Sequence, residues 1–275
     1  MTARFAPQRP SSHLWISLCT IGGSSILADA GDRWGATVKT LTVMSRKGGA
    51  GKTTVAVNLT LAARAMGVKA VLADADPLRS ASEVLRDRKD AAGLIFETAA
   101  SKLFALTEAS RRAGADLLII DTPAAPEADV AEAVKVADLC LAVSRPTYLD
   151  LAAAVRSVAI IQRLGREGMI VLNQCAPARN GVEPPAVVKA FEALRFAGLP
   201  VTPVALRSRM IYQTAFAHAR SVLEIDKDGA AATEVLELFK AVWRRLGGEI
   251  RKPIRTANDD LRRPAARPSM GYLNP

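Results

Sequence analysis

A cluster of glycines and lysines, Lys47-Gly48-Gly49-Ala50-Gly51-Lys52-Thr53-Thr54, stands between an apolar run and a helical pattern. Residues 38–45 (VKTLTVMS) indicate a buried strand, and residues 54–66 (TVAVNLTLAARAM) indicate a helix. Three glycines let the backbone turn several N–H groups inward, which forms a concave site for phosphate oxygens at the helix N-terminus. Lys52 is positioned to reach the β- and γ-phosphates, and the Thr53 hydroxyl to ligate Mg²⁺. The pattern therefore predicts a strand-loop-helix unit that binds a nucleoside triphosphate.

The start of this loop departs from the common triphosphate-binding pattern G-x-x-x-x-G-K-[ST], because Arg46 occupies the position of its first glycine. The chain instead follows K-G-G-x-G-K-T, with Lys47 in front of the glycines. In this feature it resembles the deviant Walker A ATPases of the ParA/MinD superfamily. The resemblance implies that Lys47 crosses a dimer interface and contacts the phosphates of the partner's nucleotide. Lys47 and Lys52 are thus expected catalytic residues.

Acidic residues follow two of the expected strands. Asp74 and Asp76 end one strand in the sequence D-A-D-P, and Asp121 ends the apolar run LLIID. A carboxylate at the end of a buried strand can hold a water of the Mg²⁺ shell without immersing its charge in the core. The resemblance implies that Asp121 and Asp74 serve the metal, together with Thr53, and that Asp76 places or activates the attacking water. Capping of the turn before Pro77 is the alternative role for both residues of the D-A-D-P segment.

The nucleotide is expected to be ATP with Mg²⁺. No guanine-reading N-K-x-D motif is present. Asn173 resembles the strand-end asparagine that contacts adenine in the family, although an asparagine that caps a strand would look the same. Residues 122–125 resemble the switch segment that senses the γ-phosphate. Residues 143–151 resemble the P-x-x-x-D-L stretch of partition ATPases.

Apolar runs and helical periodicity alternate along the chain. Beyond the phosphate loop, strands are expected at 69–74, 92–98, 116–121, 138–144, 169–173 and 201–206, and helices at 147–164, 185–197 and 229–246. This alternation predicts an α/β fold with a doubly wound, mostly parallel sheet, helices on both faces and ligand loops at the carboxyl ends of the strands. One ParA-like ATPase domain is expected at 38–247. Residues 1–37 are expected to be a poorly ordered N-terminal extension, and residues 248–275 a basic flexible tail.

The net charge of +10 favours polyanionic partners. Residues 205–224 are similar to the C-terminal part of small ParA-type partition ATPases, in which an R-x-R pair opens a helix. On that resemblance, Arg207, Arg209 and Arg220 are the expected contacts to DNA phosphates. Such contacts bind with little sequence preference and strong salt dependence. A solvated basic surface without a ligand is the alternative.

These features predict an ATPase with a slow intrinsic rate that forms an ATP sandwich homodimer and binds DNA non-specifically. A ParB-like or cargo adaptor protein would stimulate hydrolysis, so that the switch positions or segregates a cargo such as a plasmid, a chromosome region or a protein cluster. The expected location is cytoplasmic and nucleoid-associated.

Two alternatives remain. A MinD-like membrane-cycling ATPase is suggested by the basic amphipathic stretch 236–252, which contains Trp243. No apolar run reaches 18 residues, however, so no membrane-spanning segment is expected. A metabolic role is the third class. The three cysteines, Cys19, Cys140 and Cys175, are widely spaced, which argues against a carrier of metal clusters.

Overall fold

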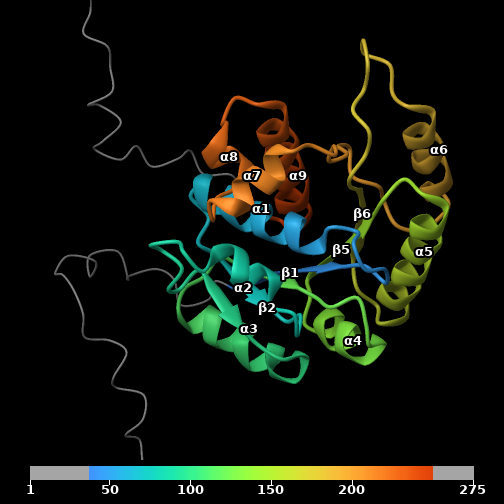
Figure 1. Ribbon diagram of the computed structural model, residues 1–275. Coiled ribbons are helices and arrows are strands. Elements are labelled where there is room, and N and C mark those ends of the chain that lie inside the picture. Colours follow the sequence, from blue (N-terminus) through green and yellow to red (C-terminus); the bar gives the residue numbers. More distant parts are fainter. Residues whose placement is uncertain (1–36, 250–275) are drawn as a thin grey trace, which may run out of the picture. The chain divides into compact units, whose positions relative to one another are not determined.

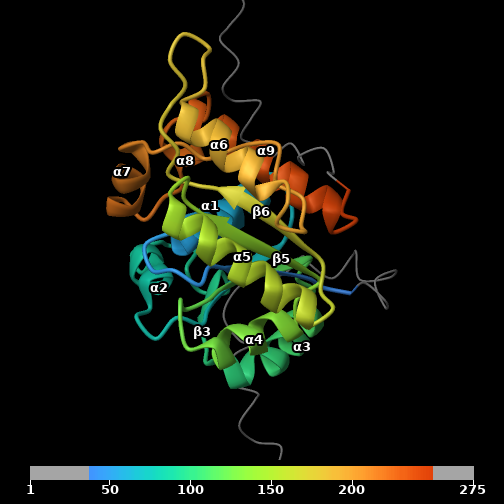
Figure 2. The ribbon, with the colours of Figure 1, turned by 90° about the vertical axis from the view of Figure 1, so that its right-hand side faces the viewer.

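The computed structural model describes residues 37–249, in which a six-stranded sheet carries helices on both faces (Figure 1, Figure 2). Neighbouring strands follow the order β3-β2-β4-β1-β5-β6, and every pairing between them is parallel. The strands are β1 Lys39–Met44, β2 Ala70–Asp74, β3 Ile95–Glu97, β4 Leu117–Asp121, β5 Leu139–Ser144 and β6 Gly168–Leu172. The predicted doubly wound α/β fold is confirmed.

The helices connect successive strands and then continue beyond the sheet. They are α1 Lys52–Ala65, α2 Ser80–Leu85, α3 Leu103–Arg112, α4 Glu127–Lys135, α5 Tyr148–Arg163, α6 Pro185–Leu194, α7 Ile211–Ala217, α8 Val222–Ile225 and α9 Ala230–Arg245, with the short 3-10 turn Ala100–Lys102 before α3. In Figure 1, α1 and α7 to α9 lie above the sheet, and α3 and α4 lie below it.

The central strands are continuous apolar runs because helices cover both of their faces. Every residue of β4 and β5 is buried. Successive side chains enter different apolar layers, as expected for a strand. Ile119 lies in the layer formed with α1 and α9, whereas Ile120 lies in the layer that contains Leu103 of α3.

The strand order reverses beside β1, which has β4 on one side and β5 on the other. In open α/β sheets, ligands bind outside the carboxyl ends of the strands at such a reversal. The loops that follow β1, β2 and β4 meet at this edge. The phosphate loop, the D-A-D-P segment and Asp121 are therefore brought together by topology.

The strand expected at 201–206 does not form. Val201 makes an isolated parallel bridge with Ile170, and the Thr202 N–H donates to the Ile170 carbonyl at 2.8 Å. The ladder then stops, because Pro203 has no N–H and the Thr202 hydroxyl bonds to the Val204 carbonyl at 2.8 Å. The prediction of a strand was therefore wrong. The apolar residues of this segment do pack beside β6, but their backbone does not form a regular ladder of hydrogen bonds with it.

The apolar face of α9 is part of the core. Val235, Leu238, Phe239, Val242 and Trp243 are buried, and the helix packs against α1. The membrane alternative depended on residues 236–252, and within this stretch Leu238, Phe239, Val242 and Trp243 are buried in the core. None of the helices between residues 37 and 249 is long and apolar enough to cross a membrane. The predicted extension and tail lie outside the described residues, apart from residue 37 and residues 248–249.

Candidate functional site

The phosphate loop turns at two glycines with left-handed backbones. Gly49 has φ 76° and Gly51 has φ 91°, a region that side-chain-bearing residues rarely adopt. A Cβ on Gly51 would also lie 2.2 Å from the amide nitrogen of Asn173. Gly51 caps α1 without a side-chain hydrogen bond, so the first N–H groups of the helix are left for another acceptor. These free donors at a helix N-terminus are suited to phosphate oxygens.

A cavity of about 530 Å³ opens beside this loop. Its walls come from three loops at the carboxyl edge of the sheet: Gly48, Gly49, Gly51, Lys52 and Thr53 after β1, Asp76, Pro77, Leu78 and Ser80 after β2, and Pro123, Ala124 and Ala125 after β4. Pockets that enclose a small molecule or cofactor typically have volumes of roughly 300–1,000 Å³. The cavity thus joins the phosphate loop to the predicted switch segment and to Asp76.

Lys52 and Asp121 are both buried, and their charges lie close enough to influence each other. Burial lowers the pKa of Lys52, although the carboxylates of Asp121 and Asp76 oppose that change. Burial raises the pKa of Asp121 to about 7, and Asp74 and Asp76 add to the increase, while the Thr53 hydroxyl and Lys52 oppose it. Asp121 is fully buried. At neutral pH this carboxylate is therefore near the midpoint of its titration, and a further cation beside it would favour the ionised form.

The residues around Asp121 fit a Mg²⁺ ion. Neither of its carboxylate oxygens accepts a hydrogen bond of ordinary geometry from a described residue. Between residues 37 and 249, no three His, Cys, Asp or Glu side chains are grouped to hold a metal by themselves. Mg²⁺ commonly takes only one or two protein carboxylates and completes its shell with water and phosphate oxygens. Thr53 and Asp121 are therefore the donors suited to a metal that arrives with a nucleotide.

Asp74 and Asp76 have different surroundings. Asp74 is buried, and its two oxygens accept from the backbone N–H groups of Asp76, at 3.2 Å, and Ser82, at 2.9 Å. Asp74 thus anchors the turn that carries Asp76, as the capping alternative described. Asp76 accepts from the Leu78 N–H at 3.0 Å and also lines the cavity. Its position allows both capping and contact with a water in the cavity.

Lys47 is held on its own subunit by α5. Its ammonium lies 3.1 Å from a carboxylate oxygen of Asp150, which is buried and also accepts from Arg145 Nε at 3.0 Å and from the Thr147 hydroxyl. Burial favours the protonated form of Asp150, but the hydrogen bonds from Thr147, Arg145 and Lys47 outweigh it and hold its pKa below the ordinary value. Asp150 belongs to the predicted P-x-x-x-D-L stretch, but the sequence did not indicate its contact with Lys47.

Arg46 connects the phosphate loop to α4. Its guanidinium lies 2.8 Å from Glu127, the first residue of α4, which also binds Arg163 at 2.8 Å. The backbone N–H of Arg46 donates to the Ser157 hydroxyl of α5 at 3.2 Å. The residue that replaces the usual glycine therefore ties the loop to the helices that follow β4 and β5.

Asn173 lies against the phosphate loop. Its amide nitrogen donates to the Ala50 carbonyl at 2.8 Å, and the amide nitrogen of Gln174 donates to the Gly49 carbonyl at 3.0 Å. Side chains from the end of β6 thus support the loop from behind. The side-chain oxygen of Asn173 remains as an acceptor.

The three predicted DNA-binding arginines differ in their partners. Arg207 forms a two-pronged ion pair with Glu183, at 2.5 and 2.8 Å, and Arg209 pairs with Glu234 at 2.6 Å. Arg220 is exposed, and no acid within residues 37–249 pairs with it. Arg220 therefore offers the most accessible charge of the three.

Arg207 also closes the base of a hairpin-like loop that the sequence analysis missed. Its guanidinium donates to the Ala176 carbonyl at 3.0 Å on one arm while it pairs with Glu183 on the other. At the tip, Asn180 and Gly181 have φ 51° and 76°, and the flanking Arg179 and Val182 exchange two backbone hydrogen bonds. Asn-Gly is the strongest short signal for such a turn and would have predicted it.

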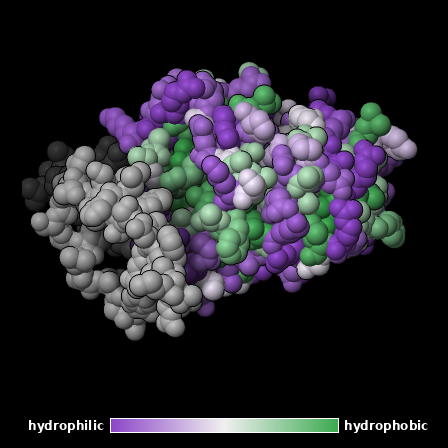
Figure 3. Space-filling view, turned by 90° about the horizontal axis from the view of Figure 1, so that it is seen from below, coloured by the Kyte–Doolittle hydropathy of each residue, from purple (hydrophilic) through white to green (hydrophobic). Residues whose placement is uncertain are grey.

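A second cavity, of about 600 Å³, lies at the opposite edge of the sheet. Its lining is mostly apolar and includes Val68, Val71, Phe96 and Leu106, with charged side chains only from Arg64 and Lys69. The face seen from below likewise shows apolar patches among hydrophilic residues (Figure 3). This cavity lacks the converging N–H groups, lysine and carboxylates of the phosphate site, which is therefore the better candidate for catalysis.

Comparison with known proteins agrees with this geometry. The family model of the CobQ/CobB/MinD/ParA nucleotide binding domain matches residues 41–247. Maintenance of carboxysome distribution protein A of Gloeobacter kilaueensis is 31% identical over 215 residues, which cover 75% of this chain and 96% of that protein.

Solved structures show the same fold. The ATP complex of a Cyanothece McdA variant superposes with a TM-score of 0.62 at 17% identity and covers 78% of this chain and 98% of that one. The septum site-determining protein MinD of Pyrococcus horikoshii, complexed with Mg-ADP, gives a TM-score of 0.61 at 18% identity. The match covers 74% of this chain and 96% of that one.

Proposed function

The chain belongs to the family of CobQ/CobB/MinD/ParA nucleotide-binding domains. We propose that it is a Mg²⁺-dependent ATPase that dimerises around ATP and positions a cargo on DNA. The observation that carries the proposal is the buried Asp121, which accepts no hydrogen bond of ordinary geometry from any residue between 37 and 249, together with Lys52 and the N-terminus of α1, which has no side-chain cap. A buried carboxylate suits a cation, and the N–H groups at the start of α1 suit a polyanion. Mg²⁺ with a triphosphate provides both.

Each residue of the site has a role in this proposal. The N–H groups at the start of α1 and the ammonium of Lys52 bind the phosphates, and Thr53 and Asp121 hold the metal. When bound, Mg²⁺ neutralises charge on the β- and γ-phosphate oxygens. Asp76 orients the attacking water and accepts its proton, while Asp74 keeps the turn of Asp76 in place through its two backbone hydrogen bonds.

Asn173 supports ATP over GTP. Because its amide nitrogen is committed to the Ala50 carbonyl, the side-chain oxygen is the group left for a base. An acceptor at this position suits the amino group of adenine. Guanine has a carbonyl oxygen at the corresponding position. That oxygen and the Asn173 side-chain oxygen are both acceptors, so they cannot form a hydrogen bond.

A second copy of the chain completes the proposed active state. Lys47 has to leave Asp150 before it can contact phosphates held by another subunit. Large apolar side chains are exposed around the same edge of the sheet, including Leu78 at 81%, Tyr148 at 83% and Leu149 at 64%. Exposed apolar side chains that gather at one edge are typical of an interface. They support closure of two subunits face to face over the nucleotides.

DNA is the proposed track, and an adaptor protein the proposed trigger of hydrolysis. The net charge of +10 and the exposed Arg220, which pairs with no acid in the described part of the chain, support non-specific contact with phosphates. Arg207 and Arg209 contact DNA directly only if DNA phosphates displace Glu183 and Glu234 from these arginines. The name of the 31% identical relative supports a protein assembly as one class of cargo. The proposed location is the cytoplasm, on the nucleoid.

Three lysine variants test the switch. We expect Lys52→Ala to lose nucleotide binding, and Lys47→Ala to bind ATP but stay monomeric in light scattering. Lys69→Ala, which removes an exposed lysine at the far edge of the sheet, is the matched control and should dimerise normally. Full ATP-dependent dimerisation of Lys47→Ala would contradict the proposed closure over the nucleotide.

A further inference from the structure

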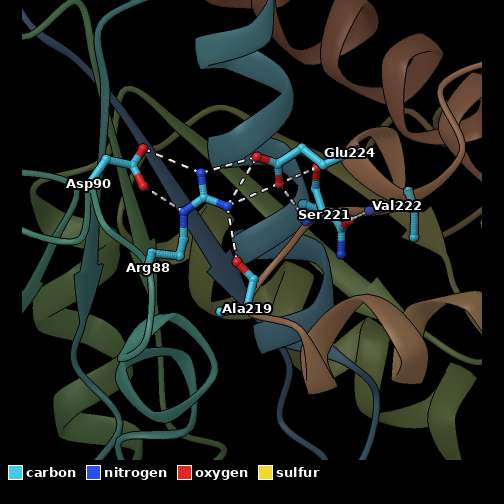
Figure 4. A network of polar contacts seen from close by, with 7 residues as sticks. Arg88, Asp90, Ala219, Ser221, Val222 and Glu224 are labelled. Carbon is cyan, nitrogen blue, oxygen red and sulfur yellow. Dashed lines mark hydrogen bonds and ion pairs between the residues drawn. The ribbon is translucent and has the colours of Figure 1, made fainter.

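Arg88, just beyond α2, joins parts of the chain that lie far apart in sequence (Figure 4). Its guanidinium donates to both carboxylate oxygens of Glu224, at 3.0 and 3.1 Å, to the Ala219 carbonyl at 3.0 Å, and to Asp90 at 2.8 Å. The Arg88 side chain is only 13% exposed. Charge-assisted hydrogen bonds with several fixed acceptors make this a strong and directional contact.

Glu224 is already committed to local structure. One of its oxygens accepts from the Ser221 N–H at 2.7 Å, while the Ser221 hydroxyl accepts from the Glu224 N–H, which forms a capping box at the start of α8. Burial raises the pKa of Glu224, but the hydrogen bonds from Arg88 and Ser221 outweigh it and leave the pKa below the ordinary value. Arg88 thus binds an ionised group that shapes the segment 219–224.

The same segment is held from its other side by the phosphate-loop helix. The Val222 N–H donates to the side-chain oxygen of Asn58 at 3.0 Å, and the amide nitrogen of Asn58 donates to the Thr54 carbonyl at 2.9 Å. Asn58 is buried in α1, which begins at Lys52. Segment 219–224 is therefore clamped between α1 and Arg88, three residues beyond the end of α2.

Both sides of the clamp lead to the triphosphate site. Asp74 binds the N–H groups of Asp76 and Ser82, so the turn of Asp76 and the first turn of α2 are held to one side chain. Ala81 and Leu85 fix α2 to the core with fully buried side chains. A displacement of the turn at Asp76 would thus move α2 and, with it, the backbone that leads to Arg88.

The clamp includes the backbone next to Arg220. Ala219 has φ 52°, a left-handed conformation that is strained for alanine, and its carbonyl is the one that Arg88 binds. The next residue is Arg220, whose side chain is exposed and has no acidic partner within the described chain. The 219–220 peptide is held at both of its polar groups: the Arg220 N–H donates to the Ala215 carbonyl of α7 at 2.9 Å, and the Ala219 carbonyl accepts from Arg88 at 3.0 Å. Loss of Arg88 removes the second of these contacts and loosens the peptide that precedes the Arg220 side chain.

We propose that Arg88 is a positioning residue that couples the triphosphate site to the DNA-binding orientation of Arg220. The inference rests on the proposed function, because it assigns the DNA contact to the same switch. Arg88 itself contacts neither nucleotide nor DNA. It acts through Glu224 and the Ala219 carbonyl, so its loss should weaken the coupling between the two sites and leave each site able to bind.

The test uses the full chain and a control that removes the same charge nearby. Arg86, which caps the end of α2, is exposed and pairs only with Glu83 among the described residues, so Arg86→Ala matches Arg88→Ala in charge but not in contacts. The affinity for a fluorescent DNA duplex is measured with ATP and with ADP. We expect wild type and Arg86→Ala to bind more tightly with ATP, and Arg88→Ala to lose at least fivefold of that gain while it still binds ATP and dimerises. An undiminished gain in Arg88→Ala would overturn the proposal.

A second readout separates this inference from the proposed function. Amide hydrogen exchange of residues 219–224 is compared with and without ATP. We expect ATP to change the exchange in wild type and Arg86→Ala but not in Arg88→Ala, whether or not DNA is bound. If wild type shows no ATP-dependent DNA binding, the proposed function fails, and the exchange data still decide on the coupling. An equal ATP response in Arg88→Ala would refute it.

A milder variant covers the case in which Arg88→Ala does not fold. Glu224→Gln keeps an acceptor for the Ser221 N–H but removes the charge that Arg88 binds. It should show the same loss of ATP response in both readouts. A wild-type response in a folded Glu224→Gln protein would count against the clamp.

Discussion

Asp121→Asn should stabilise the nucleotide-free protein at neutral and alkaline pH while it impairs Mg²⁺-ATP binding. The wild-type carboxylate is fully buried, and neither of its oxygens has a hydrogen-bond donor of ordinary geometry among the described residues. Asparagine has nearly the same shape and no charge. The substitution therefore removes the cost of ionising a group in the floor of the site, where Lys52 is the cation nearby.

The size of the effect follows from the pKa of Asp121, which rises from 3.8 to about 7 on folding. Between about pH 4 and 7 the folded state keeps the proton that the unfolded chain releases, so the free energy of unfolding falls as the pH rises. Each pH unit in this window contributes about 1.4 kcal/mol, for a total of about 4 kcal/mol above pH 7. Below pH 4 both states are protonated and this destabilisation disappears.

Urea denaturation of both proteins without nucleotide at pH 5, 6, 7 and 8 measures this difference. The buried amide of asparagine adds an offset that is the same at every pH, so the quantity to compare is the change of the difference with pH. We expect Asp121→Asn to gain about 2.5–3 kcal/mol relative to wild type between pH 5 and 8, because the folded-state pKa of about 7 leaves two pH units of this window. Asp228→Asn, at an exposed position, is the control and should show no such trend. A stability difference that does not vary with pH would refute this account of Asp121.

Three further substitutions test the loop, the lysine contact and the Arg220 segment. Gly51→Ala should reduce ATP affinity at least tenfold in a binding titration, because the added Cβ would lie 2.2 Å from Asn173 in a left-handed backbone; unchanged affinity would contradict the loop geometry. Asp150→Asn should tighten the ATP dimer about fivefold in sedimentation, because it releases Lys47 from an ion pair worth about 1 kcal/mol; a weaker dimer would argue against restraint by Asp150. Ala219→Gly should stabilise the fold by about 0.5 kcal/mol in urea denaturation, since relief of left-handed strain exceeds the added freedom of the unfolded chain; a loss of stability would show that the strain is absent.

The sheet and the phosphate loop were predictable because their determinants are local. The run of residues 117–121 is apolar throughout, as a strand covered on both faces must be, and it ends in a single acid. Gly49 and Gly51, just before Lys52, stand at left-handed positions that few other residues can occupy. Parallel topology then brings Asp76 and Asp121 to the same edge without any further information.

The partners of the charged side chains were not predictable because they depend on tertiary packing. Lys47 and Asp150 are 103 positions apart in the chain, and Arg88 and Glu224 are 136 apart. Arg207, an expected DNA contact, pairs with Glu183 at the base of the hairpin-like loop whose tip is Asn180 and Gly181. The periodicity of apolar residues, which predicts helices and strands, carries no information about such long-range contacts.

Retention of DNA in three nucleotide states tests the central proposal most directly. The full chain is mixed with a DNA duplex of arbitrary sequence in the presence of Mg²⁺ with ATP, with ADP or with no nucleotide, each at two salt concentrations. The proposal predicts retention with ATP alone, which weakens steeply as salt increases because the contacts are to phosphates. Equal retention in all three states, or no retention with ATP at low salt, would contradict an ATP switch on DNA.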